Sequence, residues 1–160
     1  MIKVLVALLL SVVHLTCYAD NKKLPVPRFA SIKSNEVNAR AGPSIKSPIE
    51  WVFIKKGEPI EIVAEYEQWR QIIDMQGEGG WVHSSVLSGK RFVVAKGKDE
   101  LQLVKDPNEI NLRVTAKLKP MVRCQLNKCK DKWCKVKCKN VDGWIQKKSL
   151  WGVYAYEEKI

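Results

Sequence analysis

The chain has 160 residues, which leaves room for one ordinary domain or two small ones, and its formal net charge is +11. No stretch after residue 19 is long and apolar enough to span a membrane, so we expect no transmembrane segment in the mature chain. Helical periodicity is nearly absent, which disfavours an α-helical fold.

The first residues have the pattern of a secretory signal peptide. A short basic start precedes an apolar run from Val4 to Val13, and the small residues Cys17 and Ala19 stand three and one before Asp20. We expect residues 1–19 to be removed and the protein to be exported. A membrane anchor is a weaker alternative, because the run is shorter than the roughly 20 residues that a span needs; lipidation of Cys17 is another.

Residues 20–30 form a polar arm with prolines, which we expect to be flexible. Short apolar segments separated by turn residues follow. Residues 59–65 alternate strictly, which predicts a half-buried strand, and residues 69–74 are its expected hairpin partner. Several short strands with turn signals between them are typical of a small barrel or sandwich.

A repeated motif divides the chain into two copies. Gly80-Trp81-Val82 has an echo in Gly143-Trp144-Ile145, and in each copy a short polar segment and a leucine follow. Each motif predicts a tight turn, a closing strand and one helical turn, with Trp81 and Trp144 in the core. We expect the first barrel over residues 31–88, a linker over 89–98 and the second barrel over 99–156. Phe92-Val93-Val94 could add a strand to either barrel.

The motifs of the first copy keep the order and spacing of a known family. They are Val37-Asn38-Ala39-Arg40-Ala41-Gly42-Pro43, Lys56-Gly57, Trp69 and the segment from Gly80 to Leu87. This copy resembles the bacterial SH3 (SH3b) domain. The second copy lacks the early Asn-x-Arg signature but keeps the middle tryptophan, Trp133, and the closing motif. The resemblance implies an all-β fold of two tandem SH3-like barrels that binds envelope ligands such as peptidoglycan or peptides.

All four cysteines of the mature chain lie in the second copy, and an even number in an exported chain indicates disulfides. A hairpin register that pairs Leu126 with Val136 sets Cys124 opposite Cys138 and leaves Cys129 near Cys134. We therefore favour the nested bridges, although the other two pairings stay open. A zinc site is a further alternative, but the spacing lacks two Cys-x-x-Cys knuckles, so we expect no metal.

The positive charge is confined to the second half. Residues 20–88 hold nine basic and nine acidic residues, whereas residues 89–160 hold eighteen and eight. Lys135 and Lys137 share the predicted outer face of their strand with Trp133. This pattern is compatible with a solvated edge hairpin or with an anion-binding face that has an aromatic platform. Nucleic acid is not the expected partner, because lysines without arginine forks suit point-charge attraction rather than bidentate readout.

Catalytic chemistry is not expected. The only histidine of the mature chain, His83, is predicted to cap a helical turn or face solvent, and no nucleophile pair can be assembled around it. The sequence has no phosphate-binding glycine loop and no dinucleotide fingerprint, so we expect no catalytic residue and no cofactor.

The sequence thus predicts a non-enzymatic, monomeric protein of the periplasm or cell envelope. Its expected partner is peptidoglycan, an envelope protein or an anionic glycolipid. The alternative is a protein–protein interaction or structural module of the envelope without glycan contact. The predicted ligand-binding residues form a groove on the first barrel and a basic face on the second: Asn38, Arg40, Trp51 and Trp69, then Trp133, Lys135 and Lys137.

Overall fold

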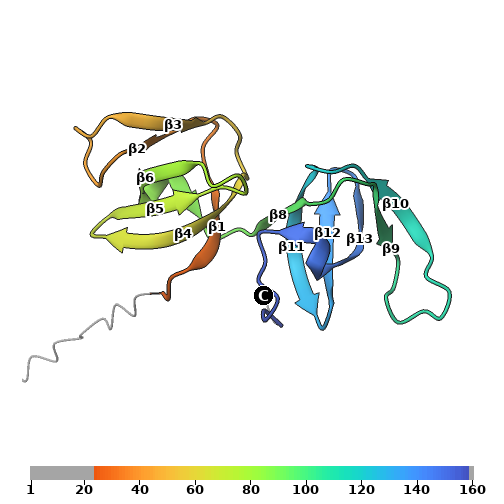
Figure 1. Cartoon of the computed structure of the whole chain (residues 1–160). Helices are drawn as coiled ribbons and strands as arrows, with labels where there is room; N and C mark the ends of the chain where they lie inside the picture. Colours follow the sequence, from red (N-terminus) through yellow and green to blue (C-terminus); the bar gives the residue numbers. More distant parts are fainter. Residues whose placement is uncertain (1–23, 159–160) are drawn as a thin grey trace, which may run out of the picture.

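The computed structural model describes residues 24–158, so the predicted signal peptide and residues 20–23 of the predicted arm lie outside the described residues. Fourteen strands in this part of the chain form two seven-stranded antiparallel sheets, one from each half of the sequence (Figure 1). The predicted all-β fold of two tandem SH3-like domains is confirmed. The described residues include no helix with the length and apolar character needed to cross a membrane.

The first sheet has the strand order β3-β2-β6-β5-β4-β1-β7. Its elements are β1 (Arg28–Ile32), β2 (Val37–Arg40), β3 (Ile49–Phe53), β4 (Pro59–Tyr66), β5 (Trp69–Ile73), β6 (Gly79–His83), the 3-10 turn η1 (Ser84–Val86) and β7 (Leu87–Ser88).

The second sheet has the equivalent order β10-β9-β13-β12-β11-β8-β14. Its elements are β8 (Phe92–Ala95), β9 (Leu101–Val104), β10 (Val114–Leu118), β11 (Arg123–Lys130), β12 (Trp133–Cys138), β13 (Val141–Gln146), the 3-10 turn η2 (Lys147–Ser149) and β14 (Leu150–Trp151).

Two boundaries differ from the prediction. Residues 28–30, expected in the flexible arm, belong to β1, because Arg28 to Ser31 pair with β4 and Ser31 and Ile32 pair with β7. The predicted linker over 89–98 contains β8, which pairs with β11 and β14 and so belongs to the second sheet. In both cases the strand is short and polar residues flank it, so the sequence around it resembles an arm or a linker.

The central hairpins of the two barrels have the same register. Ile62 pairs with Ile72 and Tyr66 with Trp69, just as Leu126 pairs with Val136 and Lys130 with Trp133. Each longer strand is irregular at the same place, directly after Ile62 or Leu126. The hairpins therefore superpose with an offset of 64 residues, which puts Cys124 at the place of Ile60. Positions two residues apart share one face of a strand, so Cys124, like Ile60 and Ile62, points inward.

A separate apolar core fills each barrel. In the first, alternation along the strands buries Ile60, Ile62, Ile72 and Val82. In the second, the inward positions include all four described cysteines together with Leu126, Val136 and Ile145. Burial of these alternate positions fixes which side chains of each strand point outward, and this determines the surface available to a ligand.

The closing motif has the predicted form in both copies. A strand, a 3-10 turn and a leucine follow one another as β6, η1 and Leu87, and again as β13, η2 and Leu150. Gly80 has φ +140°, and a Cβ there would lie 2.7 Å from the Arg40 carbonyl oxygen, so the close approach of β6 to β2 requires glycine.

Disulfides join Cys124 to Cys138 and Cys129 to Cys134, which is the nested pairing that the register predicts. With the 64-residue offset, the second bridge takes the place of an ion pair in the first barrel, where Arg70 Nε lies 2.7 Å from Glu65 Oε1. The same two neighbouring strand positions are thus cross-linked by charge in one barrel and covalently in the other.

The two barrels contact each other through β1, β4 and the C-terminal segment. Phe29 packs edge-on against Trp151, with ring centroids 5.1 Å apart, and also contacts the Tyr154 ring at 4.5 Å. The Tyr154 hydroxyl donates to Glu61, and burial together with this bond raises the pKa of that hydroxyl. Tyr154 of the C-terminal segment thus bridges to the first barrel, where Phe29 offers it an apolar surface.

A second contact between the barrels is ionic. Arg123 Nη2 lies 2.6 Å from Glu58 Oε2, and Arg123 also donates to the Lys56 carbonyl. Burial raises the pKa of the Glu58 carboxyl, and the Arg123 guanidinium opposes this shift. In Figure 1, β8 lies between β1 of the first barrel and β11 of the second.

Candidate functional site: the outer tryptophan faces

The first barrel carries two tryptophans on the outside of its central strands. Trp69 pairs with His83 and Trp81 with Gln71, so all four side chains lie on one face. The alternate residues of β5 and β6, Ile72 and Val82, are buried, which makes this face the outer one. Trp69 and Trp81 are half-buried and His83 is exposed. We call this surface the first tryptophan face; it comprises Tyr66, Trp69, Gln71, Trp81 and His83.

The second barrel repeats this arrangement. Trp133 pairs with Gln146 and with Lys130, while Trp144 pairs with Lys135. Cys134, Val136 and Ile145 are buried, so these side chains again lie outside. We call this surface the second tryptophan face; it comprises Lys128, Lys130, Trp133, Lys135, Trp144 and Gln146.

Trp81 and Trp144 are therefore not core residues, contrary to the prediction from the sequence. In the closing motif the residue after each tryptophan, Val82 or Ile145, enters the core instead. Alternation along a strand allows only one of two neighbours to point inward, and the β-branched residue takes that place. The tryptophans are left half-exposed on the surface, where a ligand can reach them.

The two faces keep both tryptophans and differ in charge. By strand register, Tyr66 of the first barrel corresponds to Lys130, and Gln71 to Lys135. Lys128 has Ala64 as its counterpart. The second face therefore gains three lysines, whereas the first is neutral and aromatic. Lys128 Nζ lies 5.6 Å from the centroid of the Trp144 ring, a cation–π contact.

The predicted groove residues of the first barrel are only partly brought together. Arg40 pairs with Trp81 and so borders the first tryptophan face, on which Trp69 lies, and Asn38 is exposed further along β2. Arg40 also donates to the Ser47 carbonyl at 2.8 Å, which braces the loop between β2 and β3. Trp51, 39% exposed, pairs with the fully buried Ala39 and thus points to the other side of the sheet, at the edge strand β3.

The predicted residues of the second barrel lie together. Trp133, Lys135 and Lys137 alternate with the buried Cys134, Val136 and Cys138 along β12, so they share its outer side. Lys135 Nζ lies 3.3 Å from Asp142 Oδ2, but both side chains are well exposed and such a surface pair contributes little energy. Its ammonium group stays accessible to another anion.

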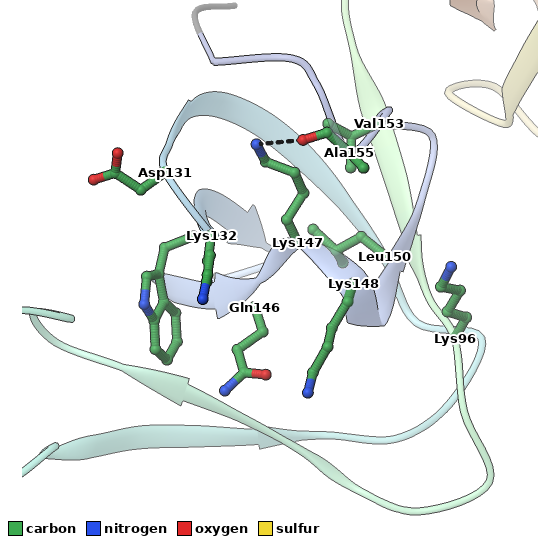
Figure 2. A pocket seen from close by; sticks show the side chains of 10 residues that line it. Lys96, Asp131, Lys132, Gln146, Lys147, Lys148, Leu150, Val153 and Ala155 are labelled. Carbon is green, nitrogen blue, oxygen red and sulfur yellow. Dashed lines mark hydrogen bonds between the residues drawn. The ribbon is translucent and has the colours of Figure 1, made fainter.

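A cavity of about 550 Å³ opens beside Trp133, at the end of the second tryptophan face. Its apolar wall includes Leu150 and Val153, and Figure 2 shows Lys132, Gln146 and Lys148 extending to the same side of it. We call it the lysine cavity; its polar lining comes from Lys96, Lys132, Gln146, Lys147 and Lys148, with Asp131 as the acidic member.

Lys147 is the buried member of this group. It is 7% exposed, and its ammonium group donates to the carbonyl oxygens of Ala155 at 3.2 Å and Glu157 at 2.6 Å, the first of which is drawn in Figure 2. These bonds hold the C-terminal segment over η2. Sequence reasoning missed the cavity lysines as a group. Aligning the two closing motifs puts Lys147 and Lys148 at the places of Ser84 and Ser85, and this would have marked both lysines as specific to the second barrel.

His83 caps η1, as predicted. Its Nδ1 accepts the Ser85 backbone N–H at 3.3 Å and lies 2.8 Å from Ser85 Oγ, and its ring meets Trp69 edge-on. A serine–histidine contact was not expected from the sequence. It is a local contact within an exposed turn, and the nitrogen involved is already an acceptor for the backbone, so it serves as a cap.

The described residues contain no cluster of three or more histidine, cysteine or acidic side chains that could hold a metal ion. The four cysteines between Cys124 and Cys138, considered as zinc ligands from the sequence, are all joined in disulfides. The first face offers aromatic rings, an amide and the His83 imidazole, and the second offers aromatic rings, an amide and ammonium groups.

Two small antiparallel barrels with exposed tryptophans define a class of tandem binding modules. The family model of the bacterial SH3 domain matches the chain twice, over residues 33–89 and 97–152. The chain belongs to the bacterial SH3 domain family, whose members are in general binding modules. No curated protein matches the chain.

Proposed function

We propose that this protein is an exported, non-enzymatic module of the cell envelope that binds peptidoglycan through its two tryptophan faces. The observation that carries the proposal is the retention of an outward tryptophan pair in both barrels, Trp69 with Trp81 and Trp133 with Trp144. Half-buried indole rings on an otherwise polar surface supply a rigid apolar platform, on which the C–H faces of sugar rings can stack.

The charge difference between the faces supports a division of labour. The first face is neutral and suits the glycan itself, whereas Lys135 on the second face and Lys137 further along the outer side of β12 add attraction to the carboxylates of cell-wall peptides. Bidentate readout is not needed for such attachment, because ammonium groups act as point charges. Two modules in one chain also raise avidity on a polymer with repeated binding sites.

Sedimentation with purified peptidoglycan tests the proposal. We expect the mature protein to be retained, and expect Lys135→Glu/Lys137→Glu to lower its affinity roughly tenfold at low salt, since two attractive charges become repulsive. Lys117→Glu/Lys119→Glu is the matched control, because both lysines are exposed at the end of the edge strand β10, and β9 separates that strand from β13 and the second tryptophan face. It should retain most of the binding.

The result that would overturn the proposal is lack of retention of the wild-type protein at low salt. The alternative in which the barrels bind an envelope protein without glycan contact would then be tested by cross-linking in intact cells. A signal peptide is assayed separately: export predicts that the N-terminus of the purified protein begins at Asp20.

A further inference from the structure

The lysine cavity carries more positive charge than the acidic groups around it balance. Lys96, Lys132 and Lys148 make no salt bridge with any acidic side chain between residues 24 and 158. Lys147 is bonded only to carbonyl oxygens. Four ammonium groups around one hollow repel each other, and an anion placed among them relieves that repulsion.

The fold itself does not need these lysines. In the first barrel the Ser84 N–H donates to the Gln68 carbonyl at 2.8 Å, and in the second the Lys147 N–H donates to the Lys132 carbonyl at the same distance. Gln68 and Ser84 of the first barrel are therefore the counterparts of Lys132 and Lys147 in the second.

The same comparison extends to the other two lysines. Since η1 and η2 correspond residue by residue, Ser85 is the counterpart of Lys148. The N–H groups of Lys33 and Lys96 bond to Val86 and Ser149, so a lysine is common to both barrels at that place. Three neutral residues of one barrel are therefore lysines in the other, on the same backbone framework. The concentration of these lysines around one cavity of the second barrel indicates that they bind a ligand.

The chemistry of the lining selects the ligand. Every cation of the cavity is a lysine, and several ammonium groups around one hollow attract a phosphate monoester, whose charge is about −2, more strongly than a singly charged carboxylate. Trp133 and Gln146 stand at the same cavity and offer a ring for stacking and an amide for hydroxyl groups. The volume lies within the range of pockets that hold small ligands.

We propose that the lysine cavity binds a phosphate monoester carried by a sugar, with the phosphate between Lys96, Lys132 and Lys148 and the sugar ring against Trp133. Trp133 belongs to the second tryptophan face, so this inference rests on the proposed function in part. It adds a specific anion to the ligands of that face and assigns Lys132 and Lys148 as the residues that select it.

The test is titration of the mature protein with glucose 6-phosphate, followed by amide chemical shifts. We expect saturable shifts in residues 132–133 and 146–149, and little response to glucose alone. Lys132→Gln/Lys148→Ser, which installs the residues of the first barrel, should weaken binding at least tenfold. Lys105→Gln/Lys117→Gln removes the same charge elsewhere on the second barrel and should change the affinity less than twofold.

Two further probes separate the sources of affinity. Inorganic phosphate should bind at the same residues but several-fold more weakly than glucose 6-phosphate, and equal affinity would overturn the role of the sugar. Equal loss in the test and control variants would overturn the site. Failure of glucose 6-phosphate with peptidoglycan retention intact rejects this inference alone, whereas loss of peptidoglycan retention rejects the proposed function.

Discussion

The central hairpin is held differently in the two barrels. The first uses the ion pair between Glu65 and Arg70, and the second uses the Cys129–Cys134 bridge at the same strand positions, with Cys124–Cys138 as an additional cross-link. The hairpin of the second barrel also carries the excess positive charge. Like charges on neighbouring strands destabilise a sheet, and covalent cross-links offset this without adding negative charge that would neutralise the binding face.

The largest expected effect tests this difference directly. Cys124→Ala/Cys138→Ala opens a loop of about 15 residues and should lower the free energy of unfolding by about 3 kcal/mol. Cys129→Ala/Cys134→Ala opens a shorter loop and should lower the free energy of unfolding by about 2 kcal/mol in the same model. Denaturant unfolding followed by residue-resolved NMR measures both.

If charge repulsion is what the bridges oppose, added salt should reduce the penalty of either variant by screening the lysines. The first barrel provides the control, because its amide signals should keep their unfolding midpoint. A cysteine variant that destabilises both barrels equally would contradict the separate role of the bridges.

The two closing glycines provide the next comparison. Gly80→Ala places a Cβ 2.7 Å from the Arg40 carbonyl oxygen at φ +140°, and we expect a loss of roughly 2 kcal/mol in the first barrel. At Gly143 the nearest atoms would be 3.0 Å or more away, so Gly143→Ala should cost about 1 kcal/mol in the second barrel. Thermal unfolding of the two variants measures the difference, and a larger loss at Gly143 would contradict the assignment of close packing to β6 and β2.

The contact between the barrels can be broken at Tyr154. Tyr154→Phe removes the hydrogen bond to Glu61 and should lower stability by about 1 kcal/mol near neutral pH. Because the folded-state pKa of this hydroxyl is raised above its usual value of 10.0, the stabilisation is present below pH 10 and declines above it. The difference in unfolding free energy between wild type and variant should therefore shrink as pH rises past 10, and a difference independent of pH would reject the bond.

The smallest expected effect concerns the charge of the faces. Lys128→Ala/Lys135→Gln gives the second face two residues of the first and removes the cation–π contact with Trp144. We expect under about 1 kcal/mol change in stability. The salt dependence of peptidoglycan retention should become shallower, as measured by sedimentation over a salt series. An unchanged salt slope would show that other lysines provide the attraction.

Much of the fold follows from local pattern, because alternation and turn residues determine strands whatever lies next to them. The same pattern gives the hairpin register, and from Leu126 opposite Val136 the two disulfides follow. The outward direction of Trp81 and Trp144 was missed: their repetition in the two closing motifs suggested a structural role in the core, but two adjacent apolar residues compete for one inward position, and Val82 and Ile145 occupy it. The bridging role of Tyr154 could not be predicted, since it depends on how separate barrels meet.

The candidate site was predicted correctly only where its residues lie within one strand. Trp133, Lys135 and Lys137 alternate within one strand and were assigned to one surface correctly by spacing. Trp51 was grouped with Trp69 because both are aromatic, yet strand pairing puts it on the other side of the sheet. The lysine cavity combines Lys96, directly after β8, with the turn between β11 and β12, η2 and the tail, which lie apart in the sequence and meet only through closure of the second barrel.

The bond between Tyr154 and Glu61 has a consequence for the order in which the protein matures. Residues are made from the N-terminus onward, and small domains fold as units as they emerge. The first barrel can therefore acquire its own strand pairs before Tyr154 is made, but part of its surface around Phe29 is covered only when Tyr154 follows. A chain cut before Tyr154 would leave that part of the apolar surface open, so an incomplete second barrel would expose β1 of the first.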